Sequence, residues 1–313
     1  MATRPLCVGF SSATRVARFQ LGNLEVRFYD EATKRWRVFV LSEETLRLID
    51  LCLERWRREE HEARLLTMNE GRLGATLVEA AGGGGVHDTT FLLSRGADVD
   101  YRHRGETALW NSAKRGHLTV ATLLLDAGAT GLDWALHEAS SQGKTPMVAL
   151  LLDRGADIHQ YEDSVLRSSA SGGYLETTQL LLDRGANVHA RNDLALRLCA
   201  RRRNRLEMVR LLLDRGADVH AQGDEALRGV AEKGKLEMVR LMLDRGADVH
   251  AGGDLALYLA ARRGHLQMVR LLLDRGANSR SGQGGLALVA ARNNAHYEVA
   301  ALLMERSAST PAI

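Results

Sequence analysis

Apolar residues recur in short stripes, spaced three and four residues apart, through most of this chain. Within residues 254–276, one stripe is separated from a second by Gly264, and the second ends before Gly276. The first stripe comprises Leu257, Ala260 and Ala261, and the second Met268, Val269, Leu272 and Leu273. This spacing predicts amphipathic helices, and glycine favours helix ends. The pattern therefore predicts a helix, a turn, a second helix and an extended link.

The same unit returns at nearly constant intervals. Its end is marked by a glycine that follows a leucine-rich segment, as in residues 211–220, which read Leu-Leu-Leu-Asp-Arg-Gly-Ala-Asp-Val-His. These glycines are Gly96, Gly128, Gly155, Gly185, Gly216, Gly246 and Gly276, in steps of 32, 27, 30, 31, 30 and 30 residues, and Ser307 holds this place in an eighth unit. Helices of about ten residues are marginal alone, so such units must stack. We predict an all-α helix-turn-helix solenoid of about eight repeats over residues 71–309, with a frayed tail at 310–313.

The first 66 residues lack the repeat. Residues 24–30 and 35–41 alternate between apolar and polar types, which predicts a two-stranded hairpin. Ser42 then marks a helix start, and Leu46, Ile49, Leu53 and Trp56 give that helix an apolar stripe. We predict a small α+β module over residues 1–66. It either docks on the first repeat, the alternative that we favour, or forms a separate binding module.

Composition narrows the class of protein. Of the 313 residues 45% are apolar, and 42 Lys plus Arg against 39 Asp plus Glu leave a formal charge of only +3. The whole chain is therefore not a polycation suited to coating nucleic acid. Cys7, Cys52 and Cys199 are too widely spaced for a disulfide framework, which favours an intracellular location, cytoplasmic or nuclear. The acid-poor first 24 residues make a mitochondrial transit peptide a less favoured alternative, and no apolar run approaches the roughly 18 residues of a membrane span.

Particular residues of the repeats resemble the ankyrin repeat family. Residues 105–110 read Gly-Glu-Thr-Ala-Leu-Trp, similar to the family's G-x-T-P-L-H opening, and the pairs Gly116-His117 and Gly264-His265 match its G-H turn. The resemblance covers about three quarters of the chain. It implies an ankyrin-type solenoid that binds other proteins in a concave groove beside the first helices.

Departures from the family pattern also carry predictions. Most units open with Asp-x-Ala-Leu or a close variant, at Asp133, Asp163, Asp193, Asp224 and Asp254. We expect these aspartates to cap the first helices, as threonine does in the family. The 27-residue step implies almost no finger, the link between repeats, around Gly131, and hence a kink or altered curvature near residues 129–133.

The recurrent polar residues favour structural interpretations. We expect the Asp-Arg pair before each end glycine to stabilise a helix C-terminus through the arginine charge. His159, His189, His220 and His250 recur once per repeat, too far apart to share a metal, and are expected to bond backbone groups. Residues 143–145 end like a phosphate-binding loop, but Glu138 stands where that motif needs glycine. We therefore predict no enzyme, no catalytic residue, no metal site and no cofactor.

Positions that vary between repeats are the candidates for binding, because stacking does not dictate them. They cluster where each first helix ends. The candidate partner-binding residues are Lys114, Arg115, Gln142, Arg201, Arg202, Arg203, Arg205, Lys233, Arg262 and Arg263. We call this set the basic edge. Arginine presents a planar fork to carboxylates, which predicts a protein or peptide partner with an acidic face, bound by a monomer in the groove.

Two other function classes stay open. Nucleic acid along the same edge is disfavoured, because the aspartates recur nearby and aromatic residues are too sparse for a base-stacking platform. Alternatively, the N-terminal module is an adaptor that recruits machinery such as a ubiquitin ligase while the repeats select the target.

Overall fold

A computed structural model of the chain describes residues 25–30, 35–40, 43–66, 68–280 and 282–309. It divides into two compact units, residues 1–69 and 70–313. In the first unit, β1 (Glu25–Asp30) pairs antiparallel with β2 (Arg35–Val40), with Glu25 opposite Val40, and α1 spans Glu43–Leu66. That this unit is a binding module or docks on the repeats stays a prediction. The transit-peptide segment, Ser42 as a helix start and the tail at 310–313 lie outside the described residues.

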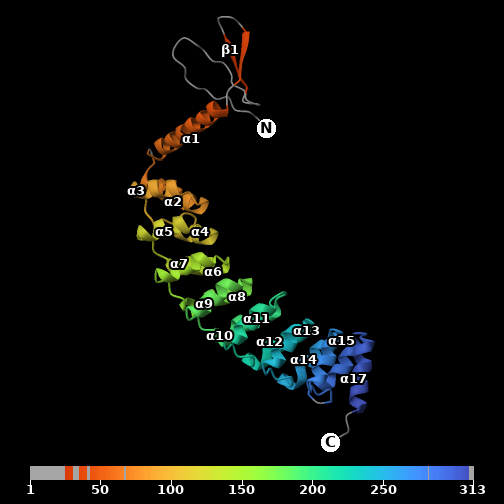
Figure 1. Ribbon diagram of the computed structural model, residues 1–313. Helices are drawn as coiled ribbons and strands as arrows, with labels where there is room; N and C mark the ends of the chain where they lie inside the picture. The colour runs from red at the N-terminus through yellow and green to blue at the C-terminus, as the bar shows by residue number, and fades with distance from the viewer. Residues whose placement is uncertain (1–24, 31–34, 41–42, 67, 281, 310–313) are drawn as a thin grey trace. The chain divides into compact units, whose positions relative to one another are not determined.

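The described residues from 70 to 309 form a helical solenoid, as predicted (Figure 1). The first helix of each repeat is α2 (Glu70–Gly83), α4 (Ala108–Arg115), α6 (Leu132–Ser141), α8 (Gln160–Gly172), α10 (Ala190–Arg201), α12 (Ala221–Glu232), α14 (Ala251–Arg262) or α16 (Ala287–Asn293). The second helix is α3 (Val86–Ser94), α5 (Leu118–Asp126), α7 (Thr145–Asp153), α9 (Leu175–Asp183), α11 (Leu206–Asp214), α13 (Leu236–Asp244), α15 (Leu266–Asp274) or α17 (Tyr297–Ser309). A single 3₁₀ turn, η1 (Gly284–Leu286), precedes α16.

Helices of one kind pack on the same helices of the next repeat. The first helices form one continuous row from α2 to α16, and the second helices form a parallel row from α3 to α17. In α12 the residues buried in this packing are small, such as Ala226 and Ala231, or branched, such as Leu227 and Val230. Small side chains let the helix row pack closely, so each repeat buries its apolar face only against its neighbours.

The end glycines have a defined backbone role. Gly216 and Gly246 adopt positive φ angles of 90° and 92°, which glycine reaches without steric cost. The amide of Ala217 then bonds the carbonyl of Leu212, closing the helix end in a Schellman-like turn. The turn directs the following link so that Ala217 and Val219 are buried.

The aspartates predicted to cap the first helices do something else. Asp224 accepts a hydrogen bond from the backbone amide of Asp248, at 2.9 Å, in the following repeat. The same bond joins Asp133 to Asp157, Asp163 to Asn187, Asp193 to Asp218 and Asp254 to Asn278, at 2.7–2.8 Å. The capping prediction is therefore wrong for these residues, whereas Thr107 does cap α4 through the amide of Trp110. We call the cross-repeat bonds the carboxylate ladder.

A left-handed turn places four of the five ladder carboxylates, all but Asp133. In α8, α10, α12 and α14 the aspartate and the two residues before it have positive φ angles, for example 56°, 63° and 57° at Gln222, Gly223 and Asp224. Aspartate tolerates this region better than most residues. The turn withdraws Asp224 from the capping position and buries its side chain between repeats.

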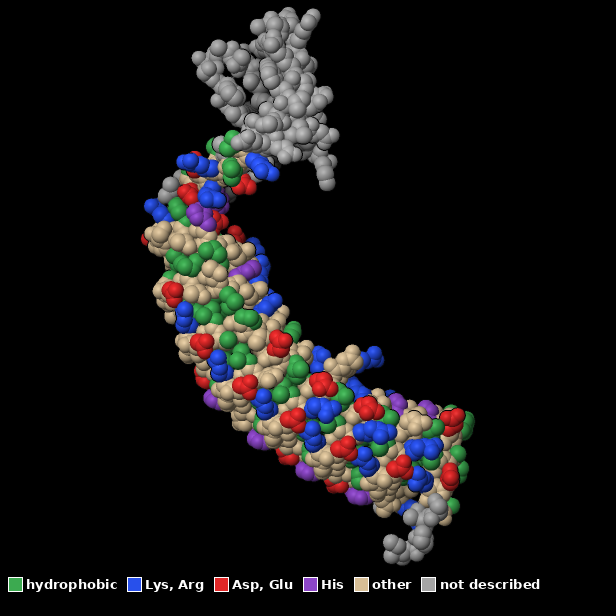
Figure 2. Space-filling view, in the orientation of Figure 1, with side chains coloured by type: hydrophobic (Ala, Val, Ile, Leu, Met, Phe, Trp, Pro, Cys, Tyr) green, Lys and Arg blue, Asp and Glu red, His purple; other side chains and the backbone are tan. Residues whose placement is uncertain are grey.

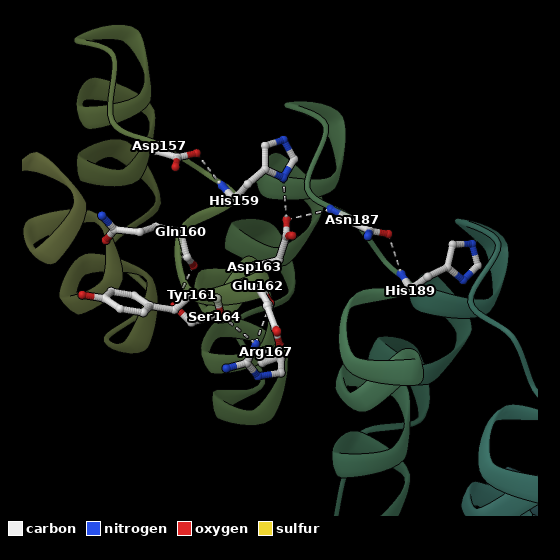
Figure 3. Close-up of polar contacts among 10 residues, drawn as sticks. All are labelled: Asp157, His159, Gln160, Tyr161, Glu162, Asp163, Ser164, Arg167, Asn187 and His189. Carbon is white, nitrogen blue, oxygen red and sulfur yellow. Dashed lines mark hydrogen bonds and ion pairs between the residues drawn. The ribbon is translucent and has the colours of Figure 1, made fainter.

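The recurrent histidines join the same ladder. His159 bonds Asp163 through Nδ1 at 3.1 Å, while its backbone amide donates to Asp157 (Figure 3). The equivalent His-Asp contacts are His189 to Asp193, His220 to Asp224 and His250 to Asp254. Because the partner is a carboxylate, Nδ1 carries the proton. The expected backbone bond from the imidazole ring is thus replaced by one to aspartate.

The Asp-Arg pairs also form ion pairs between adjacent repeats. Arg245 pairs with Asp214 of the preceding repeat at 2.7 Å, rather than acting only on its own helix end. The same arrangement joins Arg154 to Asp126, Arg184 to Asp153, Arg215 to Asp183, Arg275 to Asp244 and Arg306 to Asp274. Their aspartates are exposed, so each pair contributes about 0–1 kcal/mol. The buried carboxylate ladder matters more to the stack.

Replacing one ladder carboxylate tests this ranking. Asp224→Ala leaves the Asp248 amide without its acceptor and puts alanine at a positive φ, so it should lower the free energy of unfolding by about 2 kcal/mol. Asp224→Asn keeps an acceptor oxygen and should cost less than about 1 kcal/mol. Urea denaturation measures both, and equal effects of the two variants would contradict a role for the acceptor.

Candidate functional site

The basic edge lies where the first helices end and turn towards the second helices. The structure gives most of its members a partner within the chain. Arg262 and Arg263 both bind Glu232 of the preceding repeat, at 2.9 and 2.8 Å, and Arg201 binds Glu225 of the following repeat at 3.3 Å. Three of the predicted cations are therefore already paired with carboxylates.

Two further arginines contact backbone. Arg115 donates to the carbonyl of Gly82 at 2.7 Å, and Arg205 donates to that of Gly172 at 2.8 Å. Arg205 occupies the place of the G-H turn histidine, because His265 bonds the carbonyl of Glu232 in the same way. These two arginines therefore link adjacent repeats. The sequence did not reveal this structural role, because both arginines stand among other positive residues.

Lys114 and Gln142 complete the paired members. The Lys114 ammonium lies over the ring of Trp110, 4.4 Å from its centroid, a cation–π contact. Gln142 bonds Glu138 of its own helix at 3.2 Å.

The remaining three members are Arg202, Arg203 and Lys233, which we call the cationic patch. All three side chains are exposed, and none has a hydrogen-bond or ion-pair partner among the described residues. The turn between α10 and α11 projects beyond its neighbours in Figure 1, and Figure 2 shows Lys and Arg side chains on that projection. Burial lowers the pKa of nearby Lys235, and the charges of Lys233 and Arg203 lower it further. The patch is a local concentration of positive charge.

Aromatic residues at the opposite end of the first helices form a second feature. Trp110 and Trp134 line a cavity of about 300 Å³ between α4 and α6. The ring of Trp134 meets that of Tyr161, with centroids 5.6 Å apart. This cavity lies away from the basic edge and was not predicted, although two of the chain's four tryptophans fall in these adjacent repeats. That concentration was the available signal.

The Cys199 thiol and the side chains able to hold a metal are the remaining candidates for chemistry. Burial raises the pKa of the Cys199 thiol to about 12, so the thiol is protonated at neutral pH and is a poor nucleophile. Within the described ranges, no group of three or more His, Cys, Asp or Glu side chains is placed to hold a metal ion.

Stacked helix pairs with polar links and an exposed edge define a repeat protein of the helical solenoid class. The family model "Ankyrin repeats (3 copies)" matches residues 77–162, 136–223 and 227–312, and the chain belongs to this family. Ankyrin repeats in general mediate protein–protein interaction. No curated protein matches the chain. In the part of the chain described, none of the helices has the length and hydropathy to cross a bilayer.

The pairing of Glu232 is measurable by titration. The hydrogen bond from Arg263 lowers the pKa of Glu232, and the charges of Arg263 and Arg262 also lower it, against the opposing effect of burial. We expect the Arg262→Gln, Arg263→Gln variant to raise this pKa towards the ordinary glutamate value of about 4.3 in an NMR titration.

The lowered pKa of Glu232 also determines how the stability of the fold changes with pH. Because the folded pKa of Glu232 lies below the unfolded one, the pairing stabilises the fold above about pH 4.3, and this stabilisation is lost as the pH falls through the folded value. An unchanged Glu232 titration in the double variant would contradict the pairing.

Proposed function

We propose that the chain is a protein-interaction scaffold that holds an acidic segment of a partner protein against the cationic patch. Membership of the ankyrin family supports the general role, and the patch supports the chemistry of the partner. This proposal narrows the predicted site from the whole basic edge to Arg202, Arg203 and Lys233.

One observation carries the proposal. Arg202, Arg203 and Lys233 are exposed and have no side-chain partner among the described residues, whereas Arg262 and Arg263 share the carboxylate of Glu232. An arginine whose fork already holds a carboxylate has less to offer a partner than a free one. Free cations on a rigid stack attract an acidic chain and orient it without losing existing ion pairs.

Nucleic-acid binding along this edge is less well supported. Phosphate tracking needs a continuous row of cations. Here the carboxylates of Glu225 and Glu232 lie within the row and take up three of its arginines. The ubiquitin-ligase alternative concerns residues 1–66 and stays a prediction.

Charge reversal tests the patch. The Arg202→Glu, Arg203→Glu, Lys233→Glu variant should bind a fluorescein-labelled oligoglutamate peptide at least about tenfold more weakly than the parent chain, because attraction becomes repulsion. Fluorescence anisotropy at low salt measures this binding, since salt screens exposed charges.

The control applies the same charge change elsewhere. Arg210, Arg240 and Arg270 lie exposed on the second helices α11, α13 and α15, and their replacement by Glu alters net charge equally. The proposal requires that this control keep most of the binding. Equal losses in both triple variants would show that only net charge matters and would contradict a defined site.

A further inference from the structure

The cavity between α4 and α6 arises from an irregularity in the links. In repeats four to seven, the end glycine and the ladder aspartate are eight positions apart, as at Gly216 and Asp224, whereas Gly128 and Asp133 are only five apart. The preceding link, by contrast, is long and folds back on itself through paired backbone bonds between His103 and Glu106. A long finger beside a shortened one leaves a step in the surface, and the cavity occupies that step.

We propose that this cavity binds a short peptide segment of a partner protein, in which a bulky apolar side chain stands next to a carboxylate. The apolar side chain would lie between Trp110 and Trp134, and Arg102 would bind the carboxylate. We call the cavity the tryptophan pocket. It goes beyond the cationic patch, since it lies at the other end of the first helices and in earlier repeats.

The cavity wall combines polar residues with two tryptophan rings, of which that of Trp134 is open to a ligand and adjoins Tyr161. Trp134 is 56% exposed and Tyr161 is 55% exposed, in a chain that buries most of its large apolar side chains. The volume of about 300 Å³ is at the small end of the range for ligand pockets, roughly 300–1,000 Å³. It suits one large side chain. Tryptophan and arginine together are the residue types that dominate binding energy at protein interfaces.

The walls are also held in place before binding. Asp100 accepts two hydrogen bonds from Thr130, one from the amide and one from the hydroxyl, both at 2.8 Å. The Thr107 hydroxyl accepts from the amide of Trp110 at 3.2 Å, which fixes the start of α4. A preorganised pocket loses little conformational entropy when a ligand enters.

The polar side chains around the pocket leave one arginine in its lining that can bind a carboxylate. Asp100 and Glu106 keep their negative charges, but their oxygens already accept hydrogen bonds, from Thr130 and from Asn111, the latter at 3.0 Å. Arg102 lines the pocket and Arg104 lies in the adjoining turn, and both are exposed with no side-chain partner among the residues described. The unused hydrogen-bond donors at this site therefore belong to arginine, and Arg102 is the one that lines the cavity.

A peptide fits this arrangement better than a nucleobase. Base stacking needs an open ring face. Here Lys114 lies over Trp110, and Tyr161 meets Trp134 at an interplanar angle of 50°. Both tryptophans still line the cavity, where a side chain can pack without stacking on a ring.

An array of synthetic peptides tests the pocket on the full chain. Each peptide places Phe, Leu or Ala at the centre of a Gly-Ser background, next to Glu, Gln or Lys. We expect Phe or Leu beside Glu to be retained at least about tenfold better than the same residue beside Gln or Lys, or than Ala beside Glu. The proposal is wrong if no peptide is retained, or if retention is independent of the central residue or of the residue next to it.

Matched variants locate the binding. In fluorescence anisotropy with the best array peptide, Trp134→Ala and Arg102→Glu should each weaken binding about tenfold or more. Tyr297→Ala, at another exposed aromatic residue, and Arg270→Glu, at another exposed arginine, should leave it within about twofold. Unchanged binding by both pocket variants, with their circular dichroism also unchanged, overturns the proposal, as does equally tight, Trp134-dependent binding of oligothymidine.

The cationic patch and the tryptophan pocket can be tested independently, because each has its own variants and its own peptide. The Arg202→Glu, Arg203→Glu, Lys233→Glu variant should keep its affinity for the pocket peptide, and the pocket variants should keep theirs for oligoglutamate. Loss of pocket-peptide affinity in the patch variant would place that peptide on the cationic patch and contradict the tryptophan pocket.

Discussion

The middle of the stack depends on four buried carboxylates, each of which accepts a hydrogen bond from the following repeat: Asp163, Asp193, Asp224 and Asp254. A first helix of about ten residues is marginal by itself, and its apolar face needs a neighbour in a fixed position. The carboxylate ladder supplies that position, since Asp224 binds the Asp248 amide of the following link and His220 of its own. A buried acceptor left without its donors costs far more than an exposed ion pair contributes. The ladder thus sets the spacing of the links, and the exposed Asp-Arg pairs reinforce it.

Side chains that are not needed to join one repeat to the next are available to bind a partner. At the ends of the first helices, Glu232 and Glu225 bind three arginines of the basic edge, whereas the side chains of Arg202, Arg203 and Lys233 have no partner in the part of the chain that the structure describes. At the other end, the shortened finger near Gly131 adjoins the cavity that Trp110 and Trp134 line. Both proposed sites occur where one repeat departs from the others, the first by an extra residue after α10 and the second by missing residues before α6. Departures of this kind leave the core unchanged and alter only the surface.

The fold could be predicted from the sequence because every repeat must meet the same packing requirements as its neighbours. The period, the paired helices and the end glycines all follow from local spacing. Partners across repeats could not be predicted in the same way, since a side chain some 25–35 residues away is not marked by any local pattern. Asp224 therefore looked like a cap, and Arg205 looked like a free cation, although it bonds Gly172. The tryptophan pocket was missed because it depends on two unequal links that lie side by side only after folding.

Hydrogen exchange of the ladder amides tests the central claim most directly. The backbone amides of Asn187, Asp218, Asp248 and Asn278 belong to exposed link residues, yet each donates to a buried carboxylate of the preceding repeat. If these bonds hold the stack together, NMR should show the four amides protected as strongly as the amides within the first helices. Exchange of these amides at the rate of ordinary exposed loops, while the helices stay protected, would contradict the account.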